Sequence, residues 1–313
     1  MWKWPGLYLQ SETEERGMIN FNNLEELITL AEEKRLPIHE LVIAREMHTS
    51  QRSKADIMKE MADNWQVMQA SIAQGIKNTE KSLSGLTGGD ARRLADYGEK
   101  QEVMAPYLGE AALQAAAAAV GVNEVNAVMG RIVACPTAGS CGILPAALYA
   151  AKKRGASEEK LVRSLFTAAG IGMVIDQNAS IAGASGGCQA ECGTAASMAA
   201  GALTELAGGT PRQVGEAVAL SLKNLLGLVC DPVAGLVEVP CVKRNGFAVV
   251  EAMLAADMAL AGVKSVIPVD EVIEAMDRIG RALPKSLRET SKGGLAVTPT
   301  AKCIEKRLYG KSE

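Results

Sequence analysis

The 313-residue sequence predicts an all-α protein, and three observations support that prediction. Hydrophobic residues make up 48% of the chain but aromatic residues only 4%, so small and aliphatic side chains dominate its interior. This mix favours closely packed helices, because strands draw on β-branched and aromatic residues. Apolar residues recur at spacings of three and four, with no long alternating run and no repeat of fixed period.

The N-terminal third is predicted to form charged, amphipathic helices. Asn23 and Glu26 form a capping pair at the start of the first helix, and Pro37 follows its end. The glycine turn at 84–94 leads into another helix through Asp90. Between them, one apolar stripe predicts a helix, and it consists of Ile57, Met61, Trp65, Met68 and Ile72.

Beyond residue 105 the chain becomes rich in alanine and poor in charge. Residues 110–130 read as an Ala-rich helix, Thr210 with Pro211 starts a later helix that ends near Gly227, and 269–280 form a last one. So few charges indicate a segment hidden from water, in a core or against a partner chain. The charged residues between 177 and 230 are Glu191, Glu205, Arg212, Glu216 and Lys223.

Charge and hydropathy exclude two classes of partner. A net charge of -3 and a pI near 5.7 give no reason to expect nucleic acid. The uncharged run 132–151 is long enough to cross a bilayer, but two prolines and two glycines interrupt it, so we expect it to be buried in protein. Residues 1–17 have no secretion signal, because Pro5 and Gly6 break their apolar stretch. We expect a cytoplasmic protein with an N-terminal extension at 1–17, which need not be ordered, and a catalytic domain at 18–313.

Three of the seven cysteines are the main candidates for chemistry, and each lies within two residues of Gly or Pro in apolar surroundings. They are Cys188, Cys230 and Cys241. In a reducing compartment, cysteines suggest metal binding, catalysis or packing before disulfides. Irregular backbone is costly to bury unless it shapes a site, yet free cysteine is also among the most buried residue types. The spacing matches no standard zinc or ferredoxin pattern, so both interpretations stay open from spacing alone.

Four long motifs occur in a recognisable order. They are "NEVNAVMGRIVACPTAGSCGILPA" (123–146), "NASIAGASGGCQAECG" (178–193), "CDPVAGLVEVPCVKRN" (230–245) and "ETSKGGLAVTPT" (289–300). With them, the chain from about residue 18 to its end resembles the α chain of the iron–sulfur-dependent L-serine dehydratases, in their two-chain form.

The resemblance implies an all-helical catalytic domain that carries a [4Fe–4S] cluster on Cys188, Cys230 and Cys241. One iron is then left open for substrate, and Cys303 stands near the place where some single-chain members have a resting ligand. The implied reaction converts L-serine to pyruvate and ammonia, a step of amino-acid degradation that feeds gluconeogenesis. Metal polarisation of the serine hydroxyl would assist departure of hydroxide.

The resemblance also implies that a second chain is needed. The family's S-S-H-T-x-G-P run, whose His is the proposed base, belongs to the β part and is absent here. His39 and His48 are the only histidines, and their place in the charged N-terminal helices favours surface or helix-end roles. We therefore expect a β chain of L-serine dehydratase as partner.

Candidate substrate-binding residues lie in the glycine-rich turns and in one basic pair. Turns at 137–142 and 182–187 can form anion-binding nests, and Lys243–Arg244 offers cations, although a solvated helix start explains that pair equally well. For Cys135, Cys141 and Cys192 we expect packing roles, although Cys192 lies one helical turn from Cys188. The candidates for substrate contact are Thr137, Gly139, Ser140, Asn178, Lys243 and Arg244.

Three other functions compete with this one. A related desulfidase would remove the thiol group of cysteine by the same kind of β-elimination. A pyridoxal-phosphate lyase needs a Schiff-base lysine, and the lack of any Lys or Arg between Arg163 and Arg212 argues against it. In a non-enzymatic scaffold the metal would only support folding, but three thiolates favour an open site over a closed structural one.

Overall fold

Helices account for the regular structure of the chain. The computed structural model describes residues 19–99 and 106–310, and within those ranges it has thirteen α-helices and no β-strand, which confirms the predicted fold class. The helices are α1 (Leu24–Lys34), α2 (Ile38–Ser50), α3 (Lys54–Lys77), α4 (Asp90–Glu99), α5 (Gly109–Ala127), α6 (Ile143–Lys153), α7 (Glu158–Asn178), α8 (Gly183–Gly186), α9 (Thr194–Leu206), α10 (Pro211–Asn224), α11 (Cys241–Leu260), α12 (Val269–Ala282) and α13 (Pro299–Tyr309). The predicted extension at 1–17 lies outside the described residues.

Four short helical segments complete the secondary structure. A π-helix, η1 (Gln189–Gly193), leads directly into α9. Three 3₁₀-helices follow later, η2 (Val233–Gly235), η3 (Lys285–Leu287) and η4 (Gly294–Val297).

The predicted helix starts at Asn23 and Thr210 are confirmed, because both residues form the capping hydrogen bonds expected of them. The Asn23 side chain accepts a hydrogen bond from the backbone N–H of Glu26 at 2.8 Å. Thr210 and Gln213 form a full capping box at the start of α10, with Pro211 in the first turn. These side chains satisfy backbone N–H groups that have no partner within the helix.

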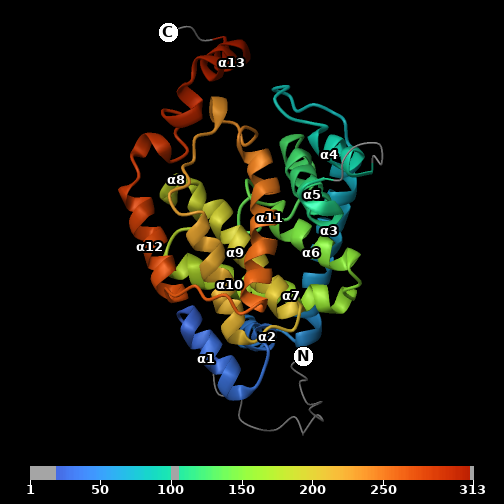
Figure 1. Cartoon of the computed structure of the whole chain (residues 1–313), viewed down its shortest axis with the longest axis vertical. Helices are drawn as coiled ribbons and strands as arrows, with labels where there is room; N and C mark the ends of the chain where they lie inside the picture. Colours follow the sequence, from blue (N-terminus) through green and yellow to red (C-terminus); the bar gives the residue numbers. More distant parts are fainter. Residues whose placement is uncertain (1–18, 100–105, 311–313) are drawn as a thin grey trace.

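Helix α9 lies at the centre of the arrangement. It packs against α6, α7, α10 and α11, while α11 also packs along α5. Figure 1 shows α3 and α4 beside α5 on one side of the molecule and α12 on the other, with α1 and α2 at the lower end and α13 at the upper end. Helix α13 packs on η2, so it covers the segment between Cys230 and Cys241.

Small residues let neighbouring helices approach closely. A Cβ placed on Gly75 of α3 would lie 2.2 Å from the carbonyl oxygen of Gly121 of α5, so the two backbones are in direct contact there. A Cβ on Gly142 would lie 2.1 Å from the carbonyl oxygen of Ala119. This packing needs glycine and alanine, which accounts for the small share of aromatic residues.

The uncharged run 132–151 is buried in its second half, as predicted, whereas Ala134 and Ala138 in its first half are exposed. Its second half forms most of α6, whose residues Ile143, Leu144 and Leu148 are buried in the core. Within the described ranges, none of the helices has both the length and the apolar character needed to span a bilayer.

Candidate active site

The structure places Cys188, Cys230 and Cys241 at the edges of regular elements. Cys188 directly precedes η1 and α9, and Cys241 is the first residue of α11. The sequence predicted irregular backbone at all three cysteines, and this is correct only for Cys230, which lies in an extended segment. The loops before Cys188 and Cys241 end at Gly187 and Pro240, so a helical segment begins at each of these two cysteines. A helix N-terminus favours a thiolate, since the macrodipole is positive there.

All three thiols are buried and share one neighbourhood. Burial raises the pKa of Cys230, and the negative charges of Cys188 and Cys241 add to that effect. Burial raises the pKa of Cys241 to about 12, again with a contribution from the charge of Cys188. Each thiol therefore lies within electrostatic range of the others, although 53 residues separate the first from the last.

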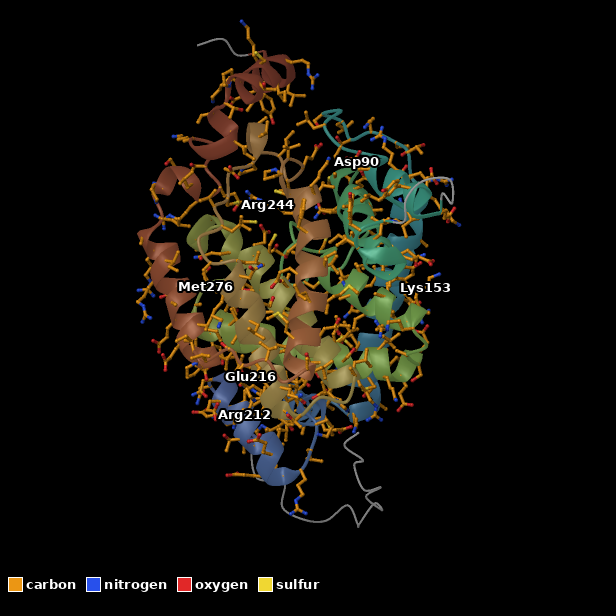
Figure 2. All side chains as sticks on the ribbon, in the orientation of Figure 1. Asp90, Lys153, Arg212, Glu216, Arg244 and Met276 are labelled. Atoms are coloured by element: carbon orange, nitrogen blue, oxygen red, sulfur yellow. The ribbon has the colours of Figure 1, made fainter. Side chains whose placement is uncertain are left out.

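Arg244 brings a positive charge to this neighbourhood. Its Nη1 donates to the carbonyl oxygen of Val229 at 2.8 Å, and its Nη2 donates to Oδ1 of Asp231 at 3.1 Å. A hydrogen bond between the thiols of Cys188 and Cys192, whose sulfurs lie 3.3 Å apart, and the charge of Arg244 hold the pKa of Cys188 below its usual value against the effect of burial. Figure 2 labels Arg244 in the upper half of the molecule.

The first glycine turn, 137–142, is fixed between α5 and α11. The carbonyl oxygen of Gly139 accepts hydrogen bonds from Nδ2 of Asn123 at 2.9 Å and from Nδ2 of Asn245 at 2.8 Å. Oδ1 of Asn245 in turn accepts from the N–H of Gly142 at 3.0 Å. Both asparagines are fully buried, so they position the turn rigidly.

Glu191, in η1, turns its carboxylate to this glycine turn. Oε1 accepts a hydrogen bond from the hydroxyl of Thr137, which lies 3.1 Å from the Ser140 hydroxyl. A Cβ on Gly139 would lie only 2.4 Å from the same oxygen, so a side chain there would displace the carboxylate from this position. Burial raises the pKa of Glu191, and the nearby charge of Glu289 contributes to the same shift.

The second glycine turn, 182–187, faces the same region. A Cβ on Gly183 would lie 3.1 Å from the sulfur of Cys230, 3.4 Å from Oε2 of Glu289 and 3.5 Å from Oε2 of Glu191. The lack of a side chain at Gly183 thus lets a cysteine and two carboxylates pack closely against its backbone.

The C-terminal motif at 289–300 closes over Cys230. The N–H of Cys230 donates to the carbonyl oxygen of Leu287 at 2.9 Å, and the N–H of Glu289 donates to the carbonyl oxygen of Cys230 at 2.8 Å. Glu289 and Ser291 both have positive φ angles, of 60° and 55°. Non-glycine residues seldom adopt this backbone, and such strain is common next to functional sites.

Three of the other predicted residues lie apart from this group. Lys243 is exposed and pairs with Asp90, with 2.6 Å between Nζ and Oδ2, so it differs from its neighbour Arg244. The side-chain amide of Asn178 donates to the backbone oxygens of Asn22 and Val174. Cys303 is exposed on α13, whereas the six other cysteines are buried.

The two histidines lie at the other end of the molecule. His39 is in the first turn of α2, and its Nδ1 lies 2.7 Å from Oε1 of Glu205, while His48 is exposed at the end of α2. Figure 1 shows α2 at the lower end, and Arg244 lies in the upper half in Figure 2. The roles expected for them, at the surface and at a helix end, match this placement.

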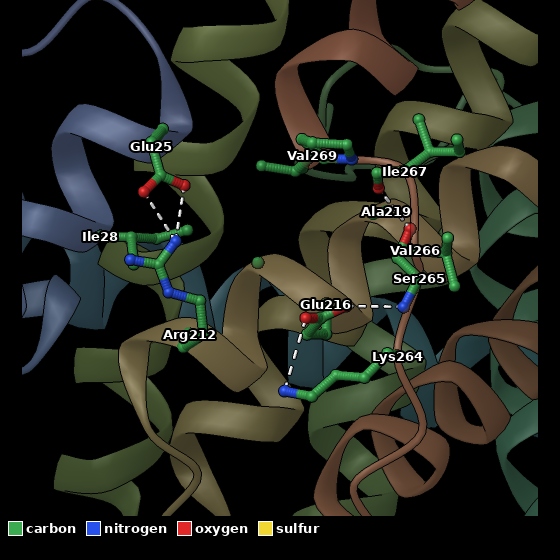
Figure 3. A pocket seen from close by; sticks show the side chains of 12 residues that line it. Glu25, Ile28, Arg212, Glu216, Ala219, Lys264, Ser265, Val266, Ile267 and Val269 are labelled. Carbon is green, nitrogen blue, oxygen red and sulfur yellow. Dashed lines mark hydrogen bonds and ion pairs between the residues drawn. The ribbon is translucent and has the colours of Figure 1, made fainter.

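Two pockets near α1 and α2 are lined by charged residues that pair with each other. A pocket of about 260 Å³ has Arg212 paired with Glu25, and Lys264 paired with Glu216 (Figure 3). Another, of about 860 Å³, is lined by residues of α2 and α7 and by the segment 205–211. Their lining residues include no cysteine, which separates them from the group around Cys230.

The cysteine group has the donor chemistry of an iron–sulfur ligand set. Within residues 19–99 and 106–310, no three His, Cys, Asp or Glu side chains are close enough together to hold one ion. Ligands of a cluster bind different irons, so their sulfurs stand farther apart than ligands of one ion do. Three buried free thiols, two of them at helix N-termini, are the soft donor set that clusters use.

Sequence reasoning missed five residues that build this region, and one of them, Asn123, carried no signal beyond its position in a recognised motif. Glu191 had a signal, because it is one of only five charges between 177 and 230. Asp231 is one of two charges between the cysteines at 230 and 241. Asn245 and Glu289 carried no signal beyond their position in recognised motifs.

Comparison with known proteins identifies the family. The family model described as "Serine dehydratase alpha chain" matches residues 33–296. The "Probable L-serine dehydratase, alpha chain" of Bacillus subtilis is 52% identical over 291 residues, which cover 93% of this chain and 96% of that protein. The "L-serine dehydratase, alpha chain" of Peptoniphilus asaccharolyticus is 41% identical, covering 91% and 97%.

A longer relative matches over part of its length. The "L-serine dehydratase" of Streptomyces coelicolor is 40% identical over 285 residues, which cover 88% of this chain but 61% of that protein. The match of the family model and these identities over nearly the whole chain lead to one conclusion. This chain belongs to the serine dehydratase alpha chain family.

Proposed function

We propose that this chain is the cluster-bearing α chain of an L-serine ammonia-lyase, which converts L-serine to pyruvate and ammonia. The observation that carries the proposal is the shared neighbourhood of Cys188, Cys230 and Cys241 beside Arg244 and Glu191. Relatives named as L-serine dehydratase α chains match nearly the whole chain and support the same reaction.

The three cysteines would hold a [4Fe–4S] cluster with one iron open to substrate. When bound, such a cluster supplies Lewis-acid activation of the substrate hydroxyl. The chain's own residues provide the surroundings. Arg244 offsets the negative charge of the thiolates, and Asn123 and Asn245 fix the turn that carries Thr137 and Gly139.

We propose that a β chain supplies the base that removes the α-proton. A base must lie within about 3 Å of that proton, directly or through one water. His39 is engaged with Glu205 at the far end of the molecule, and His48 lies on the same helix. The Streptomyces relative is longer than the matched segment, which is consistent with a further part that two-chain members carry separately. A cytoplasmic location, where thiols stay reduced, is part of the same proposal.

One alternative is weakened by the site. A pyridoxal-phosphate lyase needs a lysine for its Schiff base, but the cation beside the cysteines is Arg244, and Lys243 pairs with Asp90. A cysteine desulfidase remains within the same chemistry and is included in the substrate panel below.

The test is anaerobic reconstitution followed by a pyruvate assay. The cluster is assembled in the purified α chain, and pyruvate formation from L-serine, L-cysteine and L-threonine is measured with and without the co-expressed β chain. We expect turnover of L-serine by the mixture and little or none by the α chain alone. Comparable turnover without β would contradict the two-chain proposal, and preference for L-cysteine would assign the desulfidase reaction instead.

A further inference from the structure

Cys192 forms a close sulfur pair with a proposed cluster ligand. Its Sγ lies 3.3 Å from Sγ of Cys188, and both residues are 1% exposed. Cys188 directly precedes η1 and Cys192 lies within it, so the helical backbone places the two side chains one turn apart. A disulfide bond is about 2 Å long, so the sulfurs need to approach by roughly 1.3 Å to bond. The packing role expected for Cys192 does not account for this contact.

The other buried cysteine pair with a short sequence separation is arranged differently. Sγ of Cys135 donates to the carbonyl oxygens of Val133 and Cys141, each at 3.5 Å, and not to the second sulfur. Within the part of the chain that the structure describes, the contact between Cys188 and Cys192 is the one hydrogen bond that joins two thiols. This pair is therefore the best placed for a bond between sulfurs.

We propose that Cys188 and Cys192 form a reversible disulfide when the cluster is lost, which preserves Cys188 as a ligand. The proposal rests on the proposed function, because it concerns one cluster ligand after the iron has left. A cysteine without a thiol neighbour oxidises through sulfenic to sulfinic acid, which thiol reductants do not reverse. A neighbouring thiol instead converts the sulfenic acid to a disulfide, which thiols reduce. Cys192 then protects the cluster site against permanent damage.

Hydrogen peroxide is the oxidant in this proposal. It oxidises the sulfur of Cys188 to a sulfenic acid and is itself reduced, releasing one water. The sulfur of Cys192 then bonds to that of Cys188, and the sulfenic hydroxyl leaves with the thiol proton as a second water. Burial of the thiols does not exclude the oxidant, because a site that admits L-serine also admits the smaller peroxide molecule.

The positions of Lys and Arg make the disulfide easy to recognise. Trypsin cuts after Arg163 and Arg212, and the peptide 164–212 contains two cysteines, Cys188 and Cys192. A disulfide within a peptide makes it lighter by two hydrogens, whereas a disulfide to another cysteine links two peptides. The remaining buried cysteines also fall in pairs, Cys135 with Cys141 in peptide 132–152 and Cys230 with Cys241 in peptide 224–243.

The first test is peptide mapping of the oxidised full-length chain. The cluster-loaded chain is treated with a chelator and hydrogen peroxide, free thiols are alkylated, and the tryptic peptides are analysed by mass spectrometry. We expect peptide 164–212 to lose two hydrogens and escape alkylation, and peptide 132–152, the internal control, to be alkylated at both thiols. Alkylation of both Cys188 and Cys192, or a disulfide from either of them to another cysteine, would overturn the proposal.

The second test asks whether Cys192 protects the site. Cys192→Ser keeps a hydroxyl beside Cys188 but forms no disulfide, so we expect peroxide to leave sulfinic acid at Cys188. After dithiothreitol, iron and sulfide are added anaerobically, the recovered cluster absorbance should be at least about threefold lower than in wild type. Cys135→Ser is the matched control, also a buried cysteine, and should recover like wild type. Equal recovery in Cys192→Ser would show that the disulfide has no protective role.

These measurements do not depend on turnover. If the proposed function fails, the wild-type chain with its β chain forms no pyruvate from L-serine, yet peptide 164–212 still reports whether Cys188 and Cys192 pair. If the disulfide proposal fails, pyruvate forms while both thiols are alkylated after peroxide treatment. The two failures are therefore distinguishable in one preparation.

Discussion

Asp231 accepts hydrogen bonds from two segments far apart in the sequence. Its Oδ1 accepts from Nη2 of Arg244 at 3.1 Å, and its Oδ2 accepts from the N–H of Leu295 at 2.8 Å. One buried carboxylate thus holds the arginine beside Cys188 and also anchors the C-terminal motif that covers Cys230.

Replacing this carboxylate should destabilise the fold. In Asp231→Ala, Arg244 keeps a largely buried charge without its partner, and the Leu295 N–H loses its acceptor. We expect the free energy of unfolding of the cluster-free chain to fall by about 2–3 kcal/mol, measured by urea denaturation. Glu274→Ala, which breaks an exposed pair with Arg278, should cost no more than about 0.5 kcal/mol. Equal effects in the two variants would show that Asp231 does not act as an anchor.

The assignment of three cysteines as cluster ligands predicts that only some Cys→Ser variants lose the cluster. Serine in place of Cys188, Cys230 or Cys241 should abolish the visible absorbance of the reconstituted cluster and reduce iron content to background. The reason is that serine is a poor ligand for iron–sulfur clusters, which are held by thiolates. Cys135→Ser is the control, and its spectrum should be retained. A full cluster spectrum in any of the first three variants would remove that residue from the ligand set.

Exposure to air should inactivate the enzyme reversibly. An iron without a cysteine ligand is the one most easily lost from the cluster, so activity should decay in air together with the visible absorbance. Ferrous iron with a thiol, added anaerobically, should restore both. Full activity after prolonged aerobic treatment with a chelator would show that the reaction does not need the cluster.

Glu251 predicts a dependence of stability on pH. Burial raises its pKa from 4.5 to about 8, against the opposing effect of the Ser221 hydrogen bond. Between these values the folded chain holds a proton that the unfolded chain has released, so the free energy of unfolding falls as pH rises through this window. Glu251→Gln has no such proton. Its stability relative to wild type should therefore rise from pH 5 to pH 8, by up to about 1.4 kcal/mol per pH unit.

Urea denaturation across this pH range measures the effect. Glu274→Gln provides the comparison, since that side chain is mostly exposed and its stability difference from wild type should stay nearly flat. A flat difference for Glu251→Gln as well would mean that its carboxyl is solvated and titrates normally.

Local sequence signals predicted the helices well and the site only in part. The capping residues Asn23 and Thr210 and the stripe from Ile57 to Ile72 act through near neighbours, so periodicity is enough to find α1, α3 and α10. Glu191 and Glu289 meet because α8, η1 and the C-terminal motif pack together. That proximity depends on tertiary contacts between segments about 100 residues apart, which no local pattern encodes.

The helix starts at Cys188 and Cys241 were missed for a related reason. Gly187 and Pro240 are typical of loops, and each indeed belongs to one, but the helix begins at the very next residue. A different error affected Lys243 and Arg244, which the sequence analysis treated as one basic pair. Lys243 and Arg244 are adjacent in sequence, yet successive positions on a helix point about 100° apart, so they face different partners.

The backbone contact between Gly75 and Gly121 affects how this protein tolerates variation. Any side chain at either position would push α3 away from α5. The end of α3 leads into the loop whose Ser82 and Ser84 hold Glu238, inside the segment bounded by Cys230 and Cys241. A random mutagenesis screen for lost enzyme activity should therefore recover changes at these two glycines as well as at the cysteines. Sites of genetic sensitivity would then follow the helix packing of the molecule as well as the proposed cluster ligands.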